Sequence, residues 1–202
     1  MKTKLLAVVA GFLMLASFKP EEGLSFGDKA ADFKLKNVDG KEVSLSGDYK
    51  GAKGVIVVFT CNHCPFAKKY EDRIIALDKK YKALGYPVVA INPNDPKKES
   101  EDSYENMQKR SKEKGYSFPY LFDETQATAH AFGATRTPHV YVLQNTGSGF
   151  VVSYLGAIDD NSDDAKAVKE KYVENAVDEL LAGKPITTTK TKAIGCTIKW
   201  KA

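Results

Sequence analysis

The chain has 202 residues, of which 43% are hydrophobic and 28% are charged, and its formal net charge is +4. This length allows one domain with a full core, and the composition is that of an ordinary globular protein. The small net charge, with acids and bases interspersed, excludes the basic surface of a nucleic-acid-binding protein. We therefore expect no nucleic-acid partner.

Residues 1–18 have the layout of a secretory signal peptide. Two lysines precede an apolar run from Leu5 to Leu15, and small residues follow this run. The run is shorter than the ~20 residues of a membrane-spanning helix. We predict a periplasmic or secreted protein with no stable membrane span after signal removal. A buried N-terminal helix and an uncleaved membrane anchor are the alternatives.

The first half of the remaining chain alternates between strand and helix patterns. Two short alternating segments around Asn37–Gly40 predict a β-hairpin. Residues 54–59 are almost continuously apolar, which is typical of a strand buried on both faces. Residues 64–84 have the spacing of a helix with one apolar face that ends at Gly85.

The second half continues this alternation and closes with an antiparallel pair of strands and a last helix. Its expected elements are a strand at 88–92, a loop and exposed helix at 95–114, an extended segment at 118–123, a short helix at 125–132, strands at 139–143 and 151–155, and a helix at about 164–182. This order predicts an α/β fold with a mixed central sheet, helices on both faces and an N-terminal β-hairpin extension. We assign it to one domain, residues 24–184.

Residues 185–202 form a predicted C-terminal tail that docks on the domain. Apolar residues alternate with polar ones along it, at Ile194, Cys196, Ile198 and Trp200. Cys196 is either a small buried hydrophobic residue of this tail or a resolving thiol that reaches the other two cysteines.

Those two cysteines form the motif Cys61-Asn62-His63-Cys64, for which three interpretations compete. A structural zinc site requires four ligands, and Cys196, His130 and His139 are in no paired spacing to supply them. A structural disulfide is a second interpretation, although a domain of this size does not need a disulfide for its stability. The third is a redox-active dithiol.

The position of the motif favours redox chemistry. It lies where the buried strand ends and the amphipathic helix begins, and the first turn of a helix offers free N–H groups and a positive dipole end to a thiolate. Pro65 suits that turn because its missing N–H costs nothing there. His63 lies between the cysteines and either stabilises the thiolate or is an exposed polar turn residue.

The strand, Cys-x-x-Cys and helix, followed downstream by "GATRTPHVYVL", resemble the thioredoxin superfamily. The lead-in "GDKAADFKLKNVDGKEVSL" is similar to that of its peroxiredoxin-like (AhpC/TSA, redoxin) subgroup. The resemblance covers about Gly27 to Ala182. It implies a thioredoxin-like fold in which Thr137 precedes a cis-proline, Pro138, that aligns the substrate backbone beside the sulfurs.

The spacing of the motif resembles peroxiredoxins more than thioredoxin. One residue, Thr60, separates Phe59 from Cys61, so Cys64 falls in the register of the attacking cysteine in these families. The resemblance therefore implies a thiol peroxidase acting through Cys64 as an alternative function. Arg136, however, is one residue away from the position of the arginine that such a peroxidase uses.

The motif also resembles the copper-delivery proteins of the superfamily. Soft thiolates and an imidazole suit copper(I), and the candidate ligands are Cys61, Cys64 and His139. His139 is equally consistent with a buried strand residue. Copper delivery and a non-catalytic binding module remain alternatives outside the redox class.

The interpretation that we favour is an exported thiol-disulfide oxidoreductase. Its predicted site residues are Cys61, Cys64, His63, Thr137 and Pro138, with Cys196 as a possible resolving thiol. The substrate is a protein or small-molecule disulfide, a thiol reductase supplies electrons, and no cofactor is expected. The sequence leaves open which cysteine attacks first and whether the protein oxidises or reduces its substrate.

Overall fold

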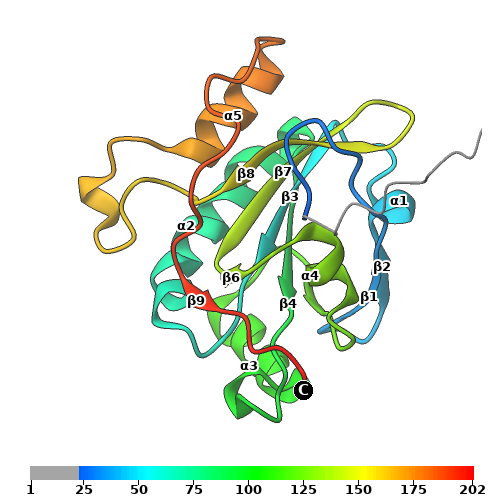
Figure 1. The fold of residues 1–202 in the computed structure, drawn as a ribbon, viewed down its shortest axis with the longest axis vertical. Helices are drawn as coiled ribbons and strands as arrows, with labels where there is room; N and C mark the ends of the chain where they lie inside the picture. The colour runs from blue at the N-terminus through cyan, green and yellow to red at the C-terminus, as the bar shows by residue number, and fades with distance from the viewer. Residues whose placement is uncertain (1–22) are drawn as a thin grey trace, which may run out of the picture.

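The computed structural model describes residues 23–202, so the predicted signal peptide lies outside the described residues. Its core is a seven-stranded mixed sheet in the order β2-β1-β5-β4-β3-β7-β8 (Figure 1). The bounds are Lys34–Asn37 for β1, Glu42–Ser44 for β2, Gly54–Phe59 for β3, Val88–Asn92 for β4, Tyr120–Phe122 for β5, His139–Asn145 for β7 and Phe150–Gly156 for β8. Two short strands, β6 (Arg136–Thr137) and β9 (Cys196–Thr197), form a separate antiparallel pair.

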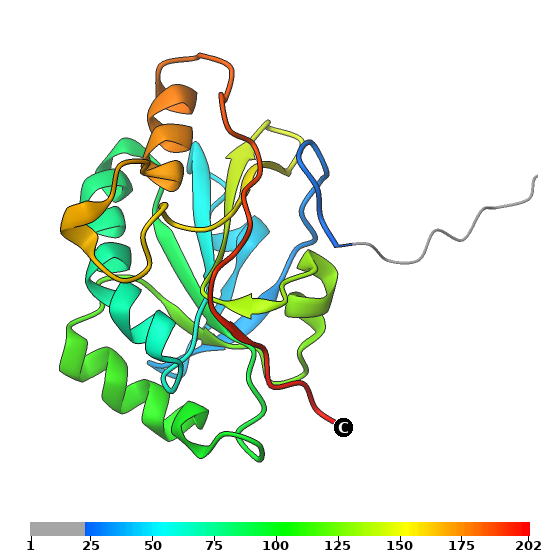
Figure 2. The same ribbon diagram turned by 60° about the vertical axis from the view of Figure 1, so that its left-hand side comes forward.

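Helices cover both faces of the sheet (Figures 1 and 2). The helices are α1 (Leu45–Asp48), α2 (Pro65–Tyr81), α3 (Tyr104–Lys114), α4 (Ala127–Phe132) and α5 (Tyr172–Leu181), with 3-10 turns η1 (Lys82–Leu84), η2 (Ser100–Asp102) and η3 (Ala165–Ala167). Apolar residues of α2, α3 and α5 pack against one face, and those of α1 and α4 pack against the other. The predicted α/β fold with a mixed sheet, helices on both faces and an N-terminal hairpin is confirmed.

The buried strand β3 lies inside the sheet. All six of its residues are buried, as its apolar sequence predicts. It pairs in parallel with β4, from Ile56 opposite Val88 to Phe59 opposite Ile91, and antiparallel with β7, where Phe59 lies opposite His139. The carboxyl ends of β3 and β4 therefore meet at one edge, together with the start of β7. The cysteine motif emerges at this edge.

Helix boundaries follow the predicted stop signals in the first half of the chain. The predicted helix at 64–84 is α2 followed by the turn η1, and Gly85 ends it in the left-handed conformation with φ 96°. Helix α3 ends at Gly115 in the same way.

The last helix begins later than the predicted residue 164. Helix α5 starts at Tyr172, and a 3-10 turn and irregular chain precede it. The Asn161 side chain accepts the backbone N–H groups of Asp163 and Asp164, and the Asp164 side chain accepts that of Lys166. These local bonds compete with a helical ladder, which explains the correction.

The C-terminal tail runs across the molecule from α5 to the cysteine edge of the sheet (Figure 1). Ile198 is buried, with its N–H bonded to the Thr135 carbonyl, and the Trp200 ring stacks on His130 at 4.2 Å between ring centroids. Ile194 is 40% exposed, so the expected alternation fails at that position. Only Cys196 and Thr197 pair as a strand, and the alternation of side chains requires a continuous ladder.

Within residues 23–202, none of the helices combines the length and the apolar character that crossing a bilayer requires.

Candidate active site

The cysteine motif forms the loop between β3 and α2. Cys64 is the N-cap residue of α2, with extended φ and ψ of −63° and 124°, and Pro65 occupies the first helical position. The Cys64 sulfur therefore lies at the end of a 17-residue helix where the backbone N–H groups have no helical partner. Both Cys61 and Cys64 are buried, with exposed fractions of 3% and 0%.

Several donors converge on the Cys64 sulfur. A hydrogen bond from the Cys61 thiol lowers the pKa of Cys64 most, and burial opposes it. The Cys196 thiol and the backbone N–H groups of Ala67 and Cys196 lower it further, so the pKa falls to about 4. Cys64 makes no side-chain cap hydrogen bond, but the backbone N–H of Ala67 helps to stabilise its thiolate. In its protonated form the Cys64 thiol donates instead to the Thr137 carbonyl, 3.2 Å away.

Cys61 is held in the opposite protonation state. Burial raises the pKa of Cys61 well above its usual range, and the hydrogen bond to Cys64 and the charge of Asp102 raise it further. Its sulfur lies 3.0 Å from the Thr137 hydroxyl. At neutral pH the pair is therefore one thiolate, Cys64, and one thiol, Cys61, that donates to it.

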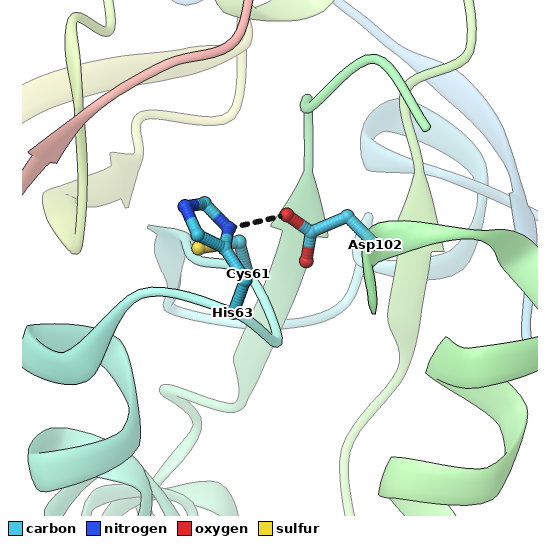
Figure 3. Close-up of side chains that lie close together, drawn as sticks. All are labelled: Cys61, His63 and Asp102. Carbon is cyan, nitrogen blue, oxygen red and sulfur yellow. Dashed lines mark hydrogen bonds and ion pairs between the residues drawn. The ribbon is translucent and has the colours of Figure 1, made fainter. Parts of the chain in front are cut away.

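His63 pairs with a buried carboxylate that the sequence analysis missed. Its Nδ1 lies 2.6 Å from Oδ2 of Asp102, the last residue of η2, and Asp102 is fully buried (Figure 3). Ligand atoms of Cys61, His63 and Asp102 all lie within 4.8 Å of one another. Figure 3 shows Cys61 and His63 together on the loop before α2, with Asp102 reaching them from the other side.

Buried amides fix the Asp102 carboxylate. The side-chain NH₂ groups of Asn94 and Asn92 lie 2.8 and 3.3 Å from its oxygens, and the backbone N–H of Asn62 donates to it at 2.6 Å. The Asn62 side chain is in turn bonded to the Tyr120 hydroxyl. The residues "NPND", which begin with the last residue of the second buried strand, were the sequence signal for this network, because neighbouring parallel strands end at the same edge.

Thr137, the residue before Pro138, lies against both cysteines. The Thr137–Pro138 peptide bond is cis, and Thr137 is fully buried. The Thr137 hydroxyl contacts Cys61 and its carbonyl contacts Cys64, so this residue holds the two sulfurs on one side of the loop.

The structure places His139 away from the sulfur cluster. Its imidazole shares a cavity with Arg136, Tyr141 and Lys190, and within the described part of the chain its Nδ1 has no hydrogen-bond partner. Burial, with a smaller effect from Lys190, lowers the pKa of His139 to about 4. The copper alternative required this residue beside Cys61 and Cys64. Among residues 23–202, the group of metal-type ligands that comes together is instead Cys61, His63 and Asp102.

The remaining candidate residues contact the C-terminal tail. Arg136 donates through Nη1 to the Gly195 carbonyl at 2.8 Å. His130, to which the sequence analysis assigned no role, stacks on Trp200. The peroxidase alternative therefore stays a prediction. Its candidate arginine, Arg136, is hydrogen-bonded to the C-terminal tail.

Comparison with known proteins identifies the family. A model of the AhpC/TSA family matches residues 26–160, which is more than half of the chain. The chain belongs to the AhpC/TSA family. This confirms the resemblance to the redoxin branch of the thioredoxin superfamily.

Individual relatives agree with this assignment. The chain is 30% identical over 132 residues to Thiol-disulfide oxidoreductase ResA of Bacillus subtilis, covering 65% of this chain and 69% of that protein. It is 39% identical, with a TM-score of 0.78, to an uncharacterized conserved protein from Geobacillus kaustophilus, covering 87% of this chain and 92% of that chain. A thioredoxin domain from Bacteroides vulgatus, at 20% identity and a TM-score of 0.53 over 64% of this chain and 88% of that one, shares the fold.

Replacing Cys61 with alanine is expected to raise the pKa of Cys64, because it removes the donor that lowers this pKa most. In the reduced wild-type protein the ultraviolet absorbance of the thiolate should have its midpoint near pH 4, and in Cys61→Ala it should move toward the ordinary value of 9.0. Because the pKa is lower in the folded chain, this ionisation stabilises the fold fully above pH 9, and the contribution disappears as the pH falls to about 4.

The Cys196→Ala variant is the matched control for this titration. Cys196 also lowers the pKa of Cys64, but by less than Cys61 does. The midpoint should therefore rise less in Cys196→Ala than in Cys61→Ala. An unchanged midpoint in Cys61→Ala would contradict the role of Cys61 as the group that lowers the pKa of Cys64 most.

Proposed function

We propose that the protein is an exported thiol-disulfide oxidoreductase in which Cys61 and Cys64 form the redox couple and Cys64 is the nucleophile. One observation carries this proposal: the Cys64 sulfur lies at the start of α2 and is surrounded by donors that stabilise its anion. The printed names of relatives such as the Bacillus subtilis protein support the reaction class.

The proposed reaction begins with attack of the Cys64 thiolate on one sulfur of a substrate disulfide. A bond forms between Cys64 and that sulfur, the substrate bond breaks, and the leaving thiolate takes up a proton. Cys61 then loses its proton, attacks the Cys64 sulfur and releases the second substrate thiol. The products are a reduced substrate and a Cys61–Cys64 disulfide, which a thiol reductase partner reduces again.

Proton transfer from Cys61 is the step that requires help. Burial keeps Cys61 protonated, and a thiol must ionise before it attacks. We assign this proton to the His63–Asp102 pair, whose ligand atoms lie within 4.8 Å of the Cys61 sulfur. Thr137 and Pro138 hold both sulfurs in place during exchange.

The stabilised thiolate also influences the direction of electron flow. Hydrogen bonds that lower the pKa of Cys64 stabilise the dithiol form relative to the disulfide, which makes the couple more oxidising. The couple therefore favours the reverse of the steps above, in which the oxidised Cys61–Cys64 pair accepts electrons from a substrate dithiol or from a reductase.

The double variant Cys61→Ser, Cys196→Ser keeps only Cys64 and is expected to accumulate a mixed disulfide with a small-molecule disulfide such as oxidised glutathione. The matched variant Cys64→Ser, Cys196→Ser keeps only the buried, protonated Cys61 and should accumulate none at neutral pH. Mass spectrometry after acid quenching measures both species. Trapping on Cys61 instead of Cys64 would reverse the assigned roles, and hydrogen peroxide turnover in the same samples checks the peroxidase alternative.

Asp102→Asn is expected to slow resolution of the mixed disulfide at neutral pH by roughly tenfold to a hundredfold, because the proton acceptor is weakened. The deficit should shrink as the pH rises, since loss of the negative charge lowers the pKa of Cys61. Stopped-flow resolution rates against pH provide the measurement, with Glu101→Gln, an exposed neighbour, as the control. A deficit that is equal at every pH would indicate a purely structural role for Asp102.

Export predicts that the mature protein lacks residues 1–18. Expression of the full chain in a bacterium, followed by fractionation and N-terminal sequencing, should find the protein outside the cytoplasm with a new N-terminus near Lys19. Replacing two leucines of the run Leu5 to Leu15 with aspartate should keep the full-length chain in the cytoplasm. An intact N-terminus on the exported wild-type protein would favour an anchor over a cleaved signal.

A further inference from the structure

The C-terminal strand β9 lies directly on the proposed redox site. It pairs antiparallel with β6, which lies beside it in Figure 1. In this pairing Cys196 is opposite Thr137, and Thr197 is opposite Arg136. Thr137 is the residue that contacts both Cys61 and Cys64. The pairing therefore brings the third cysteine of the chain to the other two, from more than a hundred residues away in sequence.

The three cysteines form one cluster. Cys196 packs against the buried cluster that contains Cys61, Cys64 and Ala67, and its thiol helps to lower the pKa of Cys64. All three are free thiols. Burial and the neighbouring Cys64 raise the pKa of Cys196 to about 11, so it is a thiol donor while Cys64 carries the charge.

The three cysteine residues are exposed to solvent unequally. Cys64 is fully buried and Cys61 is 3% exposed, whereas Cys196 is partly exposed. In this arrangement a protein disulfide approaching from solvent meets Cys196 before it meets Cys64. The proposed nucleophile therefore requires either movement of the tail or a thiol that carries the exchange outward.

Specific contacts hold the C-terminal tail against Thr137 and the Asp102 network. A Cβ atom on Gly195 would lie 2.2 Å from the Thr137 carbonyl oxygen, so only glycine allows the tail backbone to approach so closely. Arg136 donates to the Gly195 carbonyl at 2.8 Å. Further along, the backbone N–H of Lys199 donates to Asn94, a residue of the Asp102 network.

We propose that Cys196 is a third catalytic thiol, which forms a disulfide with Cys64 and carries exchange between the buried couple and partners outside. This inference rests on the proposed function of Cys61 and Cys64. The partner is a protein or peptide cysteine that reaches the partly exposed face of β9.

The exchange between the internal disulfides conserves electrons. Starting from oxidised Cys61–Cys64, the Cys196 thiol loses its proton and attacks the Cys64 sulfur; the Cys64–Cys196 bond forms, the Cys61–Cys64 bond breaks, and Cys61 takes up a proton. The disulfide has moved outward with no net oxidation. An external thiolate then attacks Cys196 and releases Cys64, which leaves readily because its anion is stabilised.

Disulfide mapping tests the internal bond. The Cys61→Ser variant, equilibrated with oxidised and reduced glutathione and quenched with acid, should contain an intramolecular Cys64–Cys196 disulfide in peptide mass spectra. The Cys64→Ser variant should contain no Cys61–Cys196 disulfide, because Cys196 contacts Cys64. Glutathione mixed disulfide on Cys64 alone, with no Cys64–Cys196 bond in Cys61→Ser, would overturn the relay while leaving the proposed nucleophile intact.

Rates of exchange between the oxidised protein and a reduced peptide that contains two cysteine thiols distinguish the relay from a tail that only covers the site. Cys196→Ser, which keeps the tail, and Gly195→Val, which cannot pair closely with Thr137, should each slow exchange roughly tenfold, because the outward thiol is lost or displaced. Thr197→Ala, an exposed β9 neighbour, is the control and should keep the wild-type rate. Wild-type rates in Cys196→Ser, or faster exchange in Gly195→Val, would show that the tail only covers the site.

The two proposals fail in different ways. Absence of a mixed disulfide between Cys64 and oxidised glutathione, a small disulfide that does not depend on the relay, in the Cys61→Ser, Cys196→Ser variant overturns the proposed function itself. A normal mixed disulfide there, together with wild-type exchange in Cys196→Ser, overturns only the relay.

Discussion

Stabilisation of one negative charge on the Cys64 sulfur is the interaction on which the rest of the site depends. The charge lies at the start of α2, where the helix leaves backbone N–H groups without partners, and two further thiols donate to it. Because Cys61 is one of these donors, the same hydrogen bond that lowers the pKa of Cys64 raises that of Cys61. The interaction between the two cysteines thus leaves Cys64 as the thiolate and Cys61 as the protonated thiol.

The second constraint is the buried Asp102 carboxylate beside the motif. A buried charge is tolerated only when it is well hydrogen-bonded, and Asn62, Asn92 and Asn94 supply these bonds. This network holds the loop after β4 against the loop after β3. It also places a carboxylate and an imidazole close to the Cys61 thiol, which must lose its proton in the reaction that we propose.

Local sequence determined much of this architecture. The apolar run at 54–59 predicts the buried strand β3, the proline after Cys64 predicts the helix start, and Gly85 and Gly115 predict the ends of α2 and α3. These features are readable because strand burial, helix capping and left-handed termination depend on residues close together in sequence. The prediction failed at 164–171, where side chains of Asn161 and Asp164 bond to nearby backbone and delay the last helix.

By itself, the sequence determined the position of a thiol pair at a strand-to-helix junction and, through "TRTP", the segment that faces it. Only the tertiary structure decided which other groups reach the sulfurs. Asp102 comes from the loop after β4 and Cys196 from the last strand, and neither lies near the motif in the chain. Sheet pairing brings them there, and the register of a strand pair is a property of the folded sheet rather than of either segment alone.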